Sequence, residues 1–270
     1  MNRRALTVPG LQPKTTGRAR PAAWLPALVG LMLGVGLALL TQAPARWLAP
    51  WVAGTGHLQL LDAQGTLWQG SARLQLTGGP GSRDQALLPD RIEWQTGASW
   101  SALHLDIKAL CCTSEPLRLS LGWAGSSARL SLADHRSLWP ADVLSGLGTP
   151  WNTLQPTGKL QLQTQGLSWD LATARLQGGA TVDLQDLGSA LSTIRPIGHY
   201  RLSLQGADTS QLTLSTVEGA LQLQGQGQWL NGRWRFKGHA STEPALEPAL
   251  GNLLNIIGRR EGARSIISFG

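Results

Sequence analysis

The feature of this 270-residue chain that most restricts its fold is an alternation of apolar and polar side chains with a period of two. In residues 159–165, "KLQLQTQ", Leu160 and Leu162 alternate with glutamines. Because successive side chains of a β-strand point to opposite faces, such a segment has one apolar face and one polar face. We therefore predict a mainly β fold, built from antiparallel sheet that is covered on one side. The same pattern occurs in residues 199–205, 220–229 and 233–240.

Turn-forming residues separate the alternating segments. Asn231-Gly232 stands between two of them, and this dipeptide is a strong short-range signal for a β-hairpin. Helices are expected over residues 140–147, which begin with a proline, and 244–257, where apolar residues recur at helical spacing. A last strand is expected over 265–269. The expected architecture is a twisted or curled antiparallel sheet with one or two short helices.

An uncharged segment near the N-terminus has the length and composition of a membrane-spanning helix. Residues 21–45 carry no charge, and the run that starts with Trp24 and Leu25 and ends at Leu40 is almost wholly apolar. About 20 apolar residues cross a bilayer as an α-helix. We therefore expect a single transmembrane anchor over residues 21–45, in contact with membrane lipid.

Positive charge is concentrated ahead of this segment. The chain has a formal net charge of +7, yet its first acidic residue is Asp62. Basic residues before an anchor predict that this end lies in the cytoplasm, so residues 1–20 are expected to be a basic cytoplasmic tail. A nucleic-acid-binding protein usually carries its basic residues on the folded part, so no nucleic-acid partner is expected. The tail contains Arg3, Arg4, Lys14, Arg18 and Arg20.

A second interpretation of the apolar segment is a cleaved signal peptide. Ala43-Pro44-Ala45 resembles a cleavage site made of small residues. Both interpretations place the chain beyond about residue 46 outside the cytoplasm. The choice between anchor and signal peptide stays open at this point.

The chain beyond the anchor is expected to form two β subdomains. A Gly-x-Leu element begins an alternating run at Gly65, Gly158 and Gly219, which suggests a duplication. We place the first subdomain at residues 46–155 and the second, with the C-terminal helix, at 156–270.

The two cysteines of the chain, Cys111 and Cys112, are adjacent. A disulfide between neighbours is strained and cannot connect distant segments. The pair also lacks the C-x-x-C spacing of redox and zinc sites. We interpret it as a buried or partly oxidised pair of small side chains, and an intermolecular disulfide in an oxidising compartment is the alternative.

The segment "GTLWQG", Gly65 to Gly70, places a tryptophan between two glycines. If the alternation continues through it, Trp68 lies on the apolar face with Gly70, where the missing side chain leaves room for a large ring. Trp94, in "RIEW", is expected to point inward as well. The segment lacks the residues of a phosphate-binding loop. A core position is therefore favoured for Trp68, with contact to a ligand as the alternative.

No pattern in the sequence indicates catalysis. The G-x-S-x-G nucleophile motif is absent, and the histidines lack the spacing of metal ligands. His104 and Asp106 share one face of a strand, and we interpret them as a surface pair because no nucleophile stands near them. We expect no enzymatic activity, no metal and no cofactor.

A short basic row occupies one face of a later strand. Arg233, Arg235 and Lys237 alternate there with Trp234 and Phe236, which point to the other face. A solvated surface is the simplest interpretation, and contact with an acidic partner or an anionic lipid surface is the alternative. Because the aromatic rings lie on the opposite face, the row is not a platform for stacking bases.

The order and spacing of these elements resemble protein N of the bacterial type II secretion system, also called general secretion pathway protein N. The basic tail, the anchor and "GTLWQG" about twenty residues later carry the first part of the resemblance, followed by Ile92-Glu93-Trp94. The adjacent cysteines are a departure from that family. The C-terminal part of the resemblance comprises "GALQLQGQG" at 219–227, which contains Gly225, "WRFKGHA" at 234–240 and "LGNLLNIIGRR" at 250–260.

This resemblance implies a single-pass inner-membrane protein with most of its chain in the periplasm. It also implies a non-catalytic contribution to the export of folded periplasmic proteins across the outer membrane, with other inner-membrane components of the system as partners. The strand pattern is similar, too, to AsmA-like and lipopolysaccharide-transport families, which hold acyl chains in an apolar trough. The alternative function is therefore a periplasmic lipid-binding module.

Overall fold

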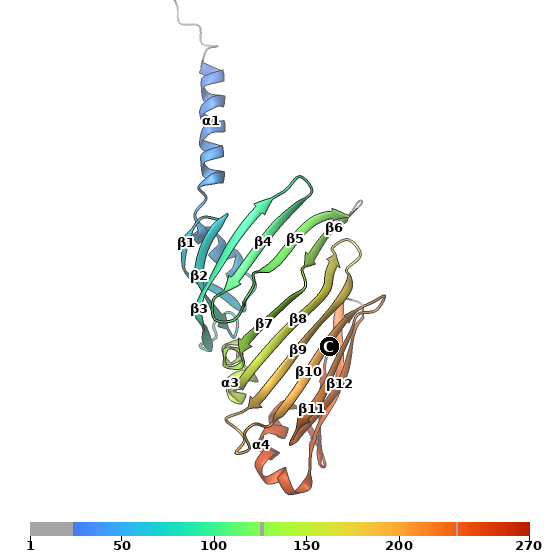
Figure 1. Ribbon diagram of the computed structural model, residues 1–270. Coiled ribbons are helices and arrows are strands. Elements are labelled where there is room, and N and C mark those ends of the chain that lie inside the picture. The colour runs from blue at the N-terminus through green and yellow to red at the C-terminus, as the bar shows by residue number, and fades with distance from the viewer. Residues whose placement is uncertain (1–23, 125–126, 231) are drawn as a thin grey trace, which may run out of the picture. The chain divides into compact units, whose positions relative to one another are not determined.

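The computed structural model describes residues 24–124, 127–230 and 232–270 (Figure 1). The chain divides into two compact units, Met1–Thr41 and Gln42–Gly270. The first unit contains the described helix α1, Trp24–Thr41, which has no acidic residue in its first turn and no basic residue in its last. The predicted basic tail at residues 1–20 lies outside the described residues.

Most of the described apolar side chains of α1 are exposed. Trp24 is exposed, as are leucines and valines that point in several directions around the helix. The side chains of Leu25 and Leu40 lie outside the described part of the chain. Within the described residues, no helix combines the length and apolar character needed to cross a bilayer. The anchor over residues 21–45 stays a prediction.

The second unit is built around one 15-stranded sheet, in which all paired strands are antiparallel. The mainly β prediction is confirmed. From one edge the strand order is β1-β2-β3-β4-β5-β6-β8-β9-β10-β11-β12-β13-β15-β14, and β7 pairs with β8 beside β6. The strands of the N-terminal half are β1 (Leu58–Gly65), β2 (Gln69–Thr77), β3 (Gln85–Ala98), β4 (Ala102–Ala109), β5 (Leu117–Ala124), β6 (Ser127–Leu132) and β7 (His135–Pro140).

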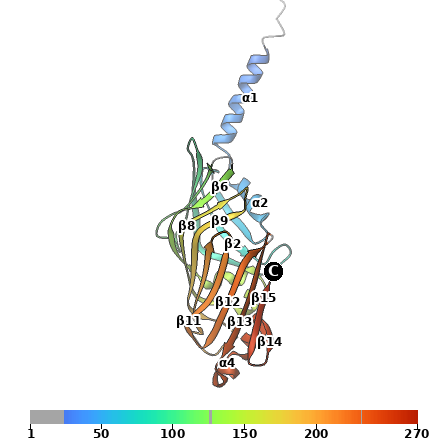
Figure 2. The same ribbon diagram turned by 90° about the vertical axis from the view of Figure 1, so that its right-hand side faces the viewer.

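Successive strands of the C-terminal half are neighbours in the sheet, with β14 returning at the edge (Figure 2). The predicted hairpin at Asn231-Gly232 is confirmed by the pairing of Leu230 with Arg233, although Asn231 itself lies outside the described residues. The strands are β8 (Thr157–Asp170), β9 (Arg175–Gly188), β10 (Gly198–Gly206), β11 (Gln211–Gly219), β12 (Leu221–Leu230), β13 (Arg233–Thr242), β14 (Arg259–Glu261) and β15 (Arg264–Phe269).

Helices α2 and α4 lie at opposite ends of the unit, and η3 packs between them against β2, β3 and β8 (Figure 2). The helix predicted at 140–147 is a 3₁₀-helix that begins one residue later, because Pro140 ends β7. The helix predicted at 244–257 is confirmed as η4 followed by α4. The elements are η2 (Ala45–Trp47), α2 (Leu48–Ala53), η3 (Ala141–Leu147), α3 (Trp151–Leu154), η4 (Pro244–Leu246) and α4 (Glu247–Ile257).

The core consists of separate clusters along the apolar face. One cluster joins α4 to the C-terminal strands and includes Tyr200, Leu221, Leu250 and Leu254. Two others lie among β1 to β4 with η2 and η3, around Ile92 and Trp94. The clusters of the two halves thus lie on either side of the predicted boundary near residue 155, whereas the sheet itself continues across this boundary. The division into subdomains 46–155 and 156–270 stays a prediction.

Candidate functional site

The turn between β1 and β2 carries the "GTLWQG" segment and holds the start of the second unit. Gly65 has a φ of +86°, a left-handed conformation that glycine adopts without strain. The Thr66 hydroxyl oxygen accepts hydrogen bonds from the backbone N–H groups of Trp68 and Gln69, both at 3.2 Å. The backbone N–H of Leu67 donates to the Ala43 carbonyl at 2.8 Å. This turn therefore fixes where the chain enters the sheet.

Gly70 makes room for a large ring, as predicted, and the ring is that of Trp94. The two residues are paired across β2 and β3. A Cβ atom on Gly70 would lie 2.5 Å from Cζ2 of Trp94, too close for any side chain. Trp94 is buried, and its Nε1–H donates to the Thr66 carbonyl at 3.3 Å. The motif thus connects a turn, a glycine and a buried indole of the next strand.

The prediction that Trp68 points into the core is wrong. Its side chain is 40% exposed, whereas that of Trp94 is 6% exposed. The physical reason is that β2 begins at Gln69, so the alternation that places Gly70 and Ala72 on one face does not extend back through the turn. Trp68 lies in the turn closed by Thr66.

Phe236 and Gly225 repeat this arrangement in the C-terminal half. A Cβ atom on Gly225 would overlap the Phe236 ring, and one on Gly227 would lie 3.1 Å from it. Phe236 is buried and stacks on Phe269 of β15, with ring centroids 5.0 Å apart. Trp234 is partly buried and meets Trp229 edge to face, with centroids 5.5 Å apart. These motif residues hold strands together.

The basic row lies on the opposite face of β13. Arg233, Arg235 and Lys237 are exposed, and within the described residues none of them is in an ion pair. Lys237 is paired with Ser268 of β15, so the row runs beside the last strand of the chain. Three unpaired cations at alternate positions form a surface that an acidic partner can neutralise.

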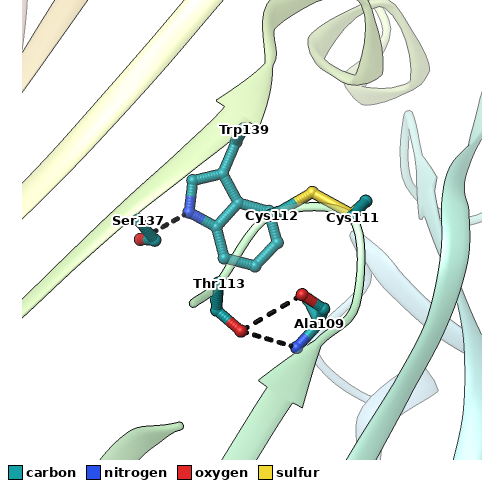
Figure 3. Close-up of a disulfide and its surroundings, with 6 residues drawn as sticks. All are labelled: Ala109, Cys111, Cys112, Thr113, Ser137 and Trp139. Carbon is teal, nitrogen blue, oxygen red and sulfur yellow. Dashed lines mark hydrogen bonds between the residues drawn. A yellow bond between two sulfur atoms is a disulfide. The ribbon is translucent and has the colours of Figure 1, made fainter. Parts of the chain in front are cut away.

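Cys111 and Cys112 form a disulfide with each other in the connection between β4 and β5 (Figure 3). Only Cys112 is buried, where it joins the cluster that contains Trp139, and Cys111 is exposed. The interpretation of a buried pair therefore holds for one of the two residues. The Cys112 carbonyl accepts a hydrogen bond from the Leu138 N–H at 2.8 Å, which ties this connection to β7.

The titratable side chains that could imitate a catalytic pair have separate partners. His104 lies 3.2 Å from the Ser99 hydroxyl, and Asp106 forms an ion pair with Arg118 at 3.0 Å. Burial lowers the pKa of His135, against the opposing charge of Glu115. In the described part of the chain, no three metal-ligating side chains are close enough together to hold an ion.

Two further pKa shifts have structural causes. The Asp170 carboxylate accepts hydrogen bonds from the Ser127 hydroxyl at 2.7 Å and the Thr173 N–H at 2.9 Å, and these lower its pKa to about 2. Burial raises the pKa of the Tyr200 phenol well above its usual range, and its hydroxyl donates to the Leu221 carbonyl at 3.0 Å. Asp170 stabilises the turn after β8, and Tyr200 stabilises the C-terminal core.

Sequence reasoning missed one surface, a group of exposed apolar residues at the turns of β3 to β9. Trp100, Trp123 and Trp169 are all exposed there. Trp100 and Trp123 stand beside sequence segments that contain serine or glycine, which was the available signal, whereas no such segment follows Trp169.

The large antiparallel sheet, whose motif residues pack between strands, defines a protein of the mainly β class. Residues 56–267 match the family model of type II secretion system (T2SS), protein N. The chain belongs to this family, which implies a component of the type II secretion system, contact with other components and a location in the bacterial envelope. No curated protein and no solved structure matches the chain. The comparisons thus give no support to the lipid-binding alternative.

Proposed function

We propose that the chain is a non-catalytic inner-membrane component of the type II secretion system, which contributes to the export of folded periplasmic proteins across the outer membrane. The observation that carries this proposal is the family match over residues 56–267, which spans nearly the whole sheet. The motif residues Gly70, Trp94, Gly225 and Phe236 are used for packing. This use supports a structural role for the sheet.

In this proposal the anchor lies within residues 21–45, residues 1–20 are cytoplasmic and the second unit is periplasmic. The support is the absence of charge from residues 21–45 and the exposure of apolar side chains such as Leu31 and Met32 around α1. The basic residues at positions 1–20 favour this orientation.

The basic row is the proposed contact for another component of the secretion system. Arg233, Arg235 and Lys237 need not break an existing ion pair to bind an acidic segment. Charged side chains at the margin of an interface mainly set the rate and specificity of association. The row would therefore select the partner, and neighbouring side chains would add the buried area.

Co-purification of secretion components with the tagged full-length chain, after mild detergent extraction, tests this proposal. Replacement of all three cations by glutamate should lower the amount of co-purified partner about tenfold, because the row would then repel an acidic segment that it now attracts. The matched control replaces Arg83 and Arg195, which are also exposed, by glutamate. If the unsubstituted chain recovers no secretion component, the proposal is contradicted. If both variants lose the same amount of co-purified partner, the basic row is not the contact.

A further inference from the structure

Apolar side chains extend along the apolar face of the sheet as far as the turns at one end of β3 to β9. Leu103 is paired with Leu121, Leu121 with Leu130 and Leu130 with Trp169, so that one apolar row crosses four strands. The turn between β3 and β4 and the turn between β8 and β9 lie at the same end of these strands (Figure 1). We call the exposed members of this surface the tip patch, which consists of Trp100, Leu103, Leu121, Trp123, Trp169 and Leu171.

The tip patch is not covered by the rest of the described chain. The three core clusters contain none of its residues. Trp100 is fully exposed, and 77% of the Trp123 side chain is exposed. Contiguous exposed apolar surface on a folded protein marks a site of contact with another protein or with a membrane.

The exposed indoles differ from the buried indole of Trp94 and the partly buried indole of Trp139 in their hydrogen bonds. The Nε1–H of Trp94 donates to Thr66, and that of Trp139 donates to the Ser137 hydroxyl. The indole N–H groups of the tip patch have no acceptor among the described residues. An exposed ring with a free donor suits the membrane–water interface, where the ring lies in the apolar layer and the N–H reaches lipid oxygens.

The second unit begins near the same end of these strands. The Ala43 carbonyl is bonded to Leu67 in the turn after β1, and the Trp68 carbonyl to the N–H of Thr96 in β3. Thr96 is paired with Leu105 of β4, the strand that carries Leu103. Neighbouring strands are about 4.8 Å apart, so these three steps and the two residues from Leu105 to Leu103 place the start of the tip patch roughly 16 Å from the entry of the chain.

We propose that the tip patch inserts into the membrane–water interface and that phospholipid is its ligand. This inference rests on the proposed function, because the proposed anchor must hold the second unit at the bilayer. Such a tether raises the effective concentration of the membrane near the patch. A few shallowly inserted tryptophans are then sufficient for binding, and the sheet acquires a fixed orientation toward the lipid surface.

Photo-crosslinking in cells tests the inference on the full-length chain. A photoreactive phenylalanine analogue replaces Trp123 in one variant and Trp100 in another, and adducts are identified by mass spectrometry after irradiation. The matched control carries the analogue at Val217 of β11, which is also exposed but lies near the other end of the strands. We expect phospholipid adducts at positions 123 and 100 at about tenfold the yield at 217, as the tether predicts. Near-ultraviolet circular dichroism shows whether each variant is folded.

Protein adducts in place of lipid adducts at positions 123 and 100 would overturn the inference, and so would equal lipid labelling at 217 or no adduct at all. Carbonate extraction of the same membranes separates this failure from failure of the proposed function. Release of the chain by carbonate would contradict the anchor itself. Retention of the chain without lipid labelling at the tip patch would contradict the inference alone.

Discussion

The indole ring of Trp94 occupies the space in which any side chain at Gly70 would stand. The two residues face each other across β2 and β3, and the ring is fixed at its other end by the hydrogen bond to Thr66. The family motif is thus explained by packing between strands. Phe236 over Gly225 shows the same use of an aromatic ring and a glycine on adjacent strands of the other half.

Substitution Gly70→Ala should destabilise the second unit by about 1–3 kcal/mol, because the added methyl group must displace a buried ring. Urea unfolding of the full-length chain in detergent, followed by tryptophan fluorescence, measures this change. Gly97→Ala is the matched control, since a Cβ atom there meets nothing within 4 Å. An equal midpoint for the two variants would show that the ring does not require the glycine.

Substitution Gly225→Ala should also lower the free energy of unfolding by about 1–3 kcal/mol, because the added methyl group overlaps the Phe236 ring. A second substitution, Phe236→Leu, removes the ring with which the added methyl group collides. The double variant should therefore lose less unfolding free energy than the two single variants lose together. A double-mutant cycle from denaturant unfolding measures this coupling. Strict additivity would mean that the ring and the glycine act independently.

Most strands could be predicted because alternation is a local property of the sequence. Tyr200, Phe236 and Ala240 are buried as their positions in the pattern require. Trp68 could not be placed by the same rule, because the first residue of β2 decides where the alternation starts. The helix at 244–257 had a local signal of its own, with prolines at its start and a glycine after its end.

The pairing of strands was not predictable from one sequence, and the candidate surfaces depend on it. Gly70 and Trp94 are far apart in the chain, so the partner of the glycine emerges only from the register of β2 and β3. The tip patch likewise needs the register that brings Leu103, Leu121 and Trp169 together. The basic row needed no such information, since it lies on one strand.

Substitution Gly251→Ala should stabilise the chain by about 0.5–1 kcal/mol. Glycine in a helix loses more conformational entropy on folding than alanine does. Gly251 lies within α4, and a Cβ atom there has open space around it. Thermal unfolding of the full-length chain should show a raised midpoint. A lowered midpoint would mean that α4 does not pack as the structure shows.

The Asp170 carboxylate predicts a specific dependence of stability on pH. Its pKa is lowered from 3.8 to about 2 in the folded chain, so its stabilising effect is present above about pH 4 and is lost as the pH falls toward 2. The stability difference between the unsubstituted chain and Asp170→Asn should therefore shrink between pH 4 and pH 2. Thermal unfolding at several pH values measures it, with Asp90→Asn as an exposed control. A difference that does not change with pH would contradict the assigned hydrogen bonds.

The central claim, that this chain serves type II secretion, is tested most directly by where an exported enzyme accumulates in cells from which the gene has been deleted. The account predicts that the secreted fraction falls, that the folded enzyme collects in the periplasm, and that resupply of the full-length chain reverses both changes. An unchanged ratio of secreted to periplasmic enzyme in the deletion strain would contradict it.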